Sequence, residues 1–79
     1  MDIRVTVPES GHLTGDVDAI VRLRMMAGDV GSSSFEVEDD QGVLSIVLHL
    51  PSFDRERAKE AARGFAEQAG FGGASVGVA

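Results

Sequence analysis

The stretch that decides the fold is GVLSIVLHLP, residues 42–51. Its large aliphatic residues alternate with smaller or polar ones, so they fall on one face of a β-strand: Leu44, Ile46, Leu48 and Leu50. This face predicts a strand anchored to the hydrophobic core. The opposite face is only half polar, which indicates a central rather than an edge position. Pro51 ends the strand because proline cannot continue a hydrogen-bonded ladder.

Three further segments show the alternation of strands. Residues 2–7 alternate strictly and stop at Pro8. Residues 34–38 alternate with Phe35 and Val37 inward, and the glycine-containing segment 39–42 predicts a turn that joins them to the central strand as a hairpin. The last segment, 74–78, predicts a weak strand.

One helix is predicted after the central strand. Ser52 or Asp54 can cap its start, and Gly70 suits a left-handed cap at its end. Its apolar residues recur at helical spacing and are mostly alanine, so the helix can lie close to the sheet: Ala58, Ala61, Ala62, Phe65, Ala66 and Ala69.

The segment 17–27 fits two structures. As a helix capped by Thr14 or Asp16, it gathers one apolar face, formed by Val17, Ile20, Val21 and Met25. The odd-numbered residues from 17 to 25 also alternate as a strand would. We favour the helix, because two methionines and an alanine fit it better.

The resulting order, β-α-β-β-α-β, predicts an α+β fold of the ferredoxin-like kind, with residues 1–79 forming one domain. Four antiparallel strands would lie in the spatial order four, one, three, two, with two helices on one face and the other face open to solvent. If residues 17–27 form a strand instead, an antiparallel sheet backed by one helix replaces this arrangement.

Composition limits the possible functions. The 79 residues include no cysteine, and no apolar run reaches the roughly 20 residues that span a bilayer. We therefore expect a soluble, cytoplasmic protein with no contact to a membrane. The net charge of −6 argues against direct binding to nucleic acid, which depends on Lys and Arg.

The negative charge is concentrated in one third of the chain. Between Met25 and Asp54 there are six acids and no Lys or Arg, whereas the remaining seven acids are balanced by seven bases. The six are Asp29, Glu36, Glu38, Asp39, Asp40 and Asp54. We predict that these residues bind a basic protein surface. The alternative is that they serve solubility and protect a sheet edge from pairing.

Catalytic and metal motifs are missing from the sequence. His12 and His49 are the only histidines, too few for a transition-metal site. Residues 32–34 are serines, but no Gly-x-Ser-x-Gly elbow surrounds them. We expect neither an enzyme nor a bound cofactor or metal.

Two families offer resemblances. Residues 5–7, the loop 11–13, a helix, residues 28–30, the strand 43–50 and a second helix resemble the layout of ACT-type amino-acid-sensing modules. That resemblance implies edge-to-edge pairing and an amino acid bound near Gly11 and His12, although Ser10 stands where those modules usually have proline.

The second resemblance rests on small size, acidity and a small α/β fold. In these features the chain is similar to phage-encoded inhibitors such as the anti-CRISPR proteins of type I systems. It implies an acidic mimic of nucleic acid that blocks a basic channel of a CRISPR effector subunit, acting in the host cytoplasm as a monomer or weak homodimer.

Overall fold

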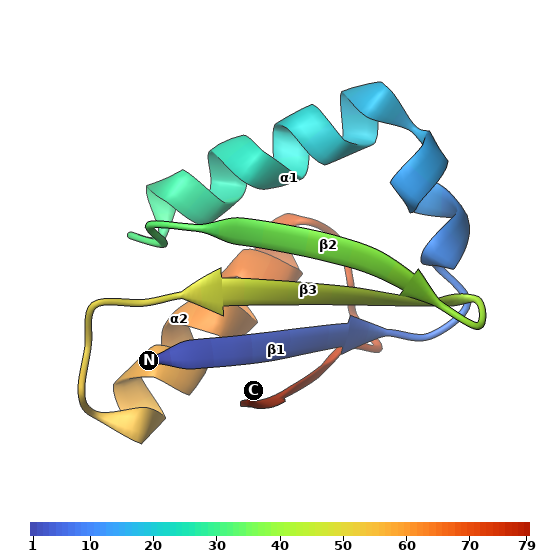
Figure 1. The fold of residues 1–79 in the computed structure, drawn as a ribbon. Coiled ribbons are helices and arrows are strands. Elements are labelled where there is room, and N and C mark those ends of the chain that lie inside the picture. Colours follow the sequence, from blue (N-terminus) through green and yellow to red (C-terminus); the bar gives the residue numbers. More distant parts are fainter.

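The computed structural model describes all 79 residues. Its elements follow the predicted order, with one short 3-10 helix, η1, added after the first strand (Figure 1). They are β1 (Asp2–Val7), η1 (Gly11–Gly15), α1 (Val17–Asp29), β2 (Phe35–Asp40), β3 (Val43–His49), α2 (Arg55–Gln68) and β4 (Ser75–Val78). The segment 17–27 is therefore helical, and the alternative in which it forms a strand is wrong.

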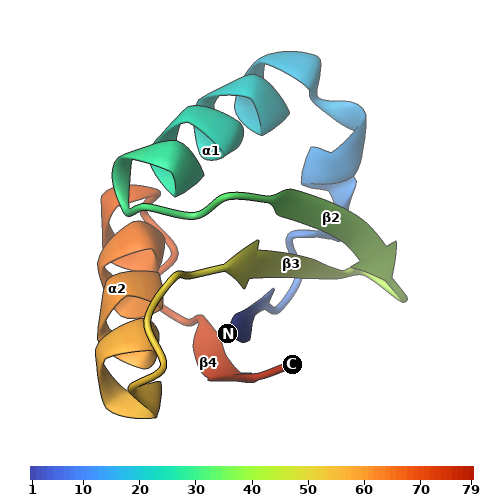
Figure 2. The same ribbon diagram turned by 60° about the vertical axis from the view of Figure 1, so that its left-hand side comes forward.

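The four strands form one antiparallel sheet in the order β2-β3-β1-β4. Strands β3 and β1 occupy the centre, and β2 and β4 form the two edges. Figures 1 and 2 show the helices gathered on one side of the sheet, with the other side uncovered. This is an α+β fold whose strand order is consistent with the predicted ferredoxin-like arrangement.

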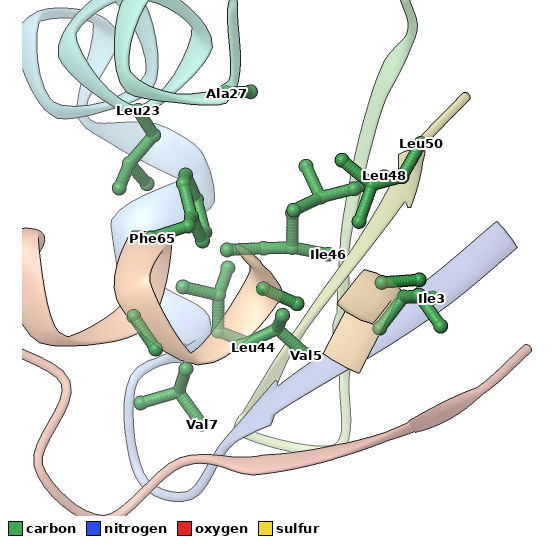
Figure 3. Close-up of a cluster of buried hydrophobic side chains, with 13 residues drawn as sticks. Ile3, Val5, Val7, Leu23, Ala27, Leu44, Ile46, Leu48, Leu50 and Phe65 are labelled. Carbon is green, nitrogen blue, oxygen red and sulfur yellow. The ribbon is translucent and has the colours of Figure 1, made fainter. Parts of the chain in front are cut away.

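The hydrophobic core lies between the sheet and the helices (Figure 3). Ile46 in β3 pairs with Val5 on one side and Val37 on the other, so the alternating residues of three strands line up on one face. The cluster contains 13 buried residues from both helices, the two central strands β1 and β3, and Leu50: Ile3, Val5, Val7, Leu23, Ala27, Leu44, Ile46, Leu48, Leu50, Ala58, Ala62, Phe65 and Ala66.

Helix α2 packs as its alanine-rich face predicts. Asp54 is the N-cap, because its carboxylate accepts hydrogen bonds from the amides of Glu56 and Arg57. At the other end Gly70 has a φ of 81°, and the Phe71 amide donates to the Ala66 carbonyl at 2.8 Å. This 6→1 bond closes the helix and turns Phe71 back toward the core.

Helix α1 buries a different side from the predicted one. Leu23 and Ala27 are buried, whereas Val17, Val21 and Met25 are exposed, so the predicted apolar face is wrong in all but Ile20, which packs against the core. The helix carries apolar residues on most of its sides, and its periodicity therefore does not define which side packs. Asp16 provides the cap by accepting from the Ala19 amide at 3.1 Å.

The hairpin between β2 and β3 is tighter than predicted. Strand β2 continues to Asp40, and only Gln41 and Gly42 form the turn, with φ angles of 54° and 85°. Two consecutive positive φ angles are typical of the type I′ turn, whose twist matches that of the flanking strands. The tighter turn places Asp39 and Asp40 within the strand, so their side chains point to opposite faces.

Candidate protein-binding surface

A row of carboxylates runs along the edge strand β2 on the open face of the sheet. The register pairs Glu36 with Val47, Glu38 with Ser45 and Asp40 with Val43. All three acidic residues are exposed. We refer to Glu36, Glu38 and Asp40 as the acidic row. They alternate with Val37 and Asp39, which face the other side, so the strand period itself gathers the charges.

Two residues of the acidic row border a shallow depression of about 450 Å³ on the open face. Its side-chain lining includes Glu36 and Glu38 from β2, Ser45 and Val47 from β3, and Arg4 from β1. Arg4 and Glu36 both pair with Val47 and are thus two strands apart, about 9.6 Å by the usual strand spacing. This spacing separates the backbones, and no ion pair joins Arg4 to a carboxylate of the acidic row.

None of the three carboxylates of the acidic row has an ionic partner within the chain. The molecule contains two ion pairs, one between His49 and Asp2 and one between Arg57 and Asp54. Four of the seven basic residues lie on α2, on the helical side of the sheet: Arg55, Arg57, Lys59 and Arg63. The acidic row therefore forms no ion pair within the fold, and Arg4 is the one basic residue that lines the depression beside it.

The other three acids predicted to bind a partner have separate positions. Asp54 caps α2, and Asp29 is the last residue of α1. Both helix ends lie at the end of the sheet remote from the β2–β3 turn (Figure 1). Asp39 points to the other side of β2, where its carboxylate accepts from the Gly42 amide at 2.8 Å and fixes the turn. The six predicted residues thus do not form one surface.

Gly11, the first residue of η1, packs against Asp39 and the hairpin turn. It is buried, and its amide donates to the Gly42 carbonyl at 2.9 Å. A Cβ atom at this position would overlap the Asp39 carboxylate and lie 2.8 Å from the Gly42 carbonyl carbon. The backbone of Gly11 therefore lies directly against the hairpin turn, and His12 is exposed in η1. Gly11 therefore has a packing role that the sequence did not indicate.

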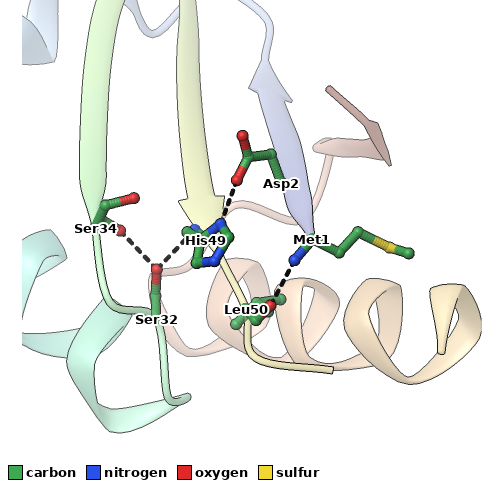
Figure 4. Close-up of polar contacts among 6 residues, drawn as sticks. All are labelled: Met1, Asp2, Ser32, Ser34, His49 and Leu50. Atoms are coloured by element: carbon green, nitrogen blue, oxygen red, sulfur yellow. Dashed lines mark hydrogen bonds and ion pairs between the residues drawn. The ribbon is translucent and has the colours of Figure 1, made fainter. Parts of the chain in front are cut away.

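A polar cluster lies at the end of the open face that is remote from the β2–β3 turn (Figure 4). His49 and Asp2 are opposite each other on β3 and β1, with Nδ1 and Oδ1 2.5 Å apart. The Ser32 hydroxyl accepts from the His49 amide at 3.0 Å and donates to the Ser34 carbonyl at 2.6 Å. The Met1 ammonium donates to the Leu50 carbonyl at 2.7 Å. These contacts hold the strand ends together, so they give His49 a structural partner.

The sequence interpretation missed that Asp40 belongs to the acidic row. The predicted turn covers four residues, 39–42, and so includes Asp40. The alternation that begins at Phe35 nevertheless continues to Asp40. Treating Gln41 and Gly42 as a two-residue turn would have extended the strand and placed the third carboxylate beside Glu38.

The structure contains neither a metal-binding group nor a membrane-spanning helix. His and acidic side chains form no group of three or more that could hold a metal ion. No helix has both the length and the apolar character needed to cross a bilayer.

No model of a known protein family matches the chain, and no curated protein matches it.

Proposed function

We propose that this protein is a non-enzymatic inhibitor that binds a basic protein surface through the acidic row. The observation that carries the proposal is the set of three exposed carboxylates, Glu36, Glu38 and Asp40, none of which has an ionic partner in the chain. Unpaired charges of one sign on an uncovered sheet face are available to an incoming partner of the opposite charge.

The geometry of a strand suits mimicry of nucleic acid. Residues two apart on β2 stand about 6.8 Å from each other, which is twice the rise per residue of an antiparallel strand. The acidic row is therefore a regularly spaced line of negative groups, as is the phosphate backbone of an extended nucleic-acid strand. A groove of arginines and lysines that recognises phosphates can bind such a line of carboxylates.

The partner we propose is the basic DNA-binding surface of a type I CRISPR effector complex. Binding there would exclude DNA by competition and would require no chemical step. Attraction between the acidic row and the groove would be long-ranged, so it should accelerate association and weaken as salt screens the charges.

Competition with DNA tests this function. A fluorescently labelled DNA duplex is bound to a purified type I effector complex, and its anisotropy is followed while the protein is added. The wild-type protein should displace the DNA at low salt and do so less effectively at 0.5 M salt. The double variant Glu36→Lys/Glu38→Lys should lose at least tenfold in apparent affinity, because like charges then face the groove.

A matched control separates the acidic row from overall charge. The variant Glu60→Lys/Glu67→Lys makes the same change in net charge at two exposed positions of α2. It should compete nearly as well as the wild type. Equal loss in both variants would show that only net charge matters, and absence of competition by the wild type would refute the choice of partner. In the latter case the carboxylates would serve solubility and edge protection.

A further inference from the structure

Helix α1 carries an apolar row on the side that faces away from the core. Val17, Val21 and Met25 have exposed fractions of 75%, 53% and 67%. They are four residues apart, so they form a continuous ridge along the helix surface, opposite the buried Leu23 and Ala27. We refer to Val17, Val21 and Met25 as the outer ridge.

Single exposed apolar residues are common on protein surfaces, whereas a contiguous apolar patch can serve as an interaction surface. No element of the fold covers the outer ridge, because the sheet and α2 both lie on the other side of α1 (Figure 2). The open face with the acidic row is on the far side of the sheet. A partner on the outer ridge would therefore leave the acidic row free.

We propose that the outer ridge pairs with the outer ridge of a second copy of this chain. The two α1 helices would cross in antiparallel orientation about a two-fold axis at Val21. Val21 would then contact Val21 of the second copy, and Val17 would contact Met25 of the second copy. Ridges of residues four apart pack into each other at a crossing angle of about −50°.

Charge complementarity favours a second copy over other occupants. Asp18 and Arg22 are four residues apart and lie on the same flank of the outer ridge. The two-fold axis brings that flank of one helix beside the same flank of the other, in opposite direction. Asp18 of each copy therefore meets Arg22 of the other copy, which produces two ion pairs across one interface.

Both side chains are free to make these contacts. Neither the Asp18 carboxylate nor the Arg22 guanidinium takes part in an ion pair within the chain. Arg22 donates only to the Asp18 carbonyl, with a long N–O distance of 3.4 Å. Arg24, toward the other flank, lies 5.8 Å from the centre of the Phe35 ring and is already engaged with β2.

The interface is small. We expect three apolar side chains and two charged side chains from each copy to bury less than the roughly 1,200 Å² of a stable complex, so the dimer should be weak and reversible. Sedimentation velocity over a wide concentration range is suited to such an equilibrium. The wild-type protein should shift from monomer to dimer as its concentration rises, and Val21→Glu should remain monomeric because two carboxylates would meet at the axis.

Complementary charge variants test the antiparallel geometry. Asp18→Arg places two arginines against two arginines, and Arg22→Asp places two aspartates against two aspartates, so each variant alone should dimerise at least tenfold more weakly. Mixed together, they restore both ion pairs and should form a heterodimer about as strong as the wild-type dimer. Circular dichroism of each variant checks that α1 remains folded.

A wild-type protein that stays monomeric at the highest accessible concentration would overturn the proposal. A mixture of the two charge variants that associates no better than either alone would overturn it too. The variant Glu36→Lys/Glu38→Lys should still dimerise, so this result is independent of the inhibitor function.

Discussion

Strands β2 and β3 form one hairpin, but they differ in what they bury and what they expose. Strand β3 lies between two neighbours, and Leu44, Ile46 and Leu48 have no exposed surface at all. Strand β2 lies at the edge, and only Phe35 and Val37 are partly buried. Strand β3 therefore contributes more to the stability of the fold, while β2 is free to carry charge on the face that the helices leave open.

The largest expected effect is on β3. Ile46→Ala removes a fully buried side chain that faces both neighbouring strands and should lower the free energy of unfolding by about 2–5 kcal/mol. Domains of this kind have only about 5–15 kcal/mol in total, so the loss is a large fraction. Urea denaturation followed by circular dichroism measures it.

Val47→Ala is the matched control, because Val47 is next in the same strand and points to the open face. Its cost should be below about 1 kcal/mol, since less apolar area returns to water. Equal losses for Ile46→Ala and Val47→Ala would contradict the division between a buried and an open face.

A smaller effect is expected where η1 contacts the hairpin. Gly11→Ala adds a methyl group that overlaps the Asp39 carboxylate and should destabilise the fold by about 1–3 kcal/mol. Thermal unfolding measures this loss. In the double variant Gly11→Ala/Asp39→Ala the overlap with the carboxylate is gone, so the two single losses should not add. Additive losses would show that Gly11 and Asp39 do not act on each other.

The smallest change in stability concerns the turn that joins the two strands. Gln41 has a φ of 54°, which asparagine adopts more readily than glutamine. Gln41→Asn should raise the free energy of unfolding by a few tenths of a kcal/mol, whereas Gln41→Val should lower it because a β-branched residue resists positive φ. Chemical denaturation that ranks the two variants in the reverse order would argue against the type I′ turn.

The same contrast explains how far the sequence predicts the structure. The residues of β3 and α2 have one clear periodicity each, so the central strand, the alanine-rich helix face and the strand order were predicted correctly. In α1 apolar residues occupy most sides, and a period alone cannot say which side meets the sheet. The buried face there depends on packing, which places Leu23 rather than Val21 inside.

The candidate site was predictable only in part. Glu36 and Glu38 follow the alternation of a half-exposed strand, and their place on the open face was predicted. The separation of Asp39 from Asp40 depends on whether the turn has two or four residues, which is decided by backbone geometry at Gln41 and Gly42. The contact between Gly11 and Asp39 joins residues that are distant in the sequence, so no local sequence pattern predicts it.

The central claim is that the acidic row binds a partner and contributes little to folding. The most direct measurement is to neutralise it, in Glu36→Gln/Glu38→Gln/Asp40→Asn, and to determine both the free energy of unfolding and the affinity for the type I effector complex. We predict an unfolding free energy within about 0.5 kcal/mol of the wild type and a dissociation constant at least tenfold higher. An unchanged dissociation constant in this folded variant would contradict the claim.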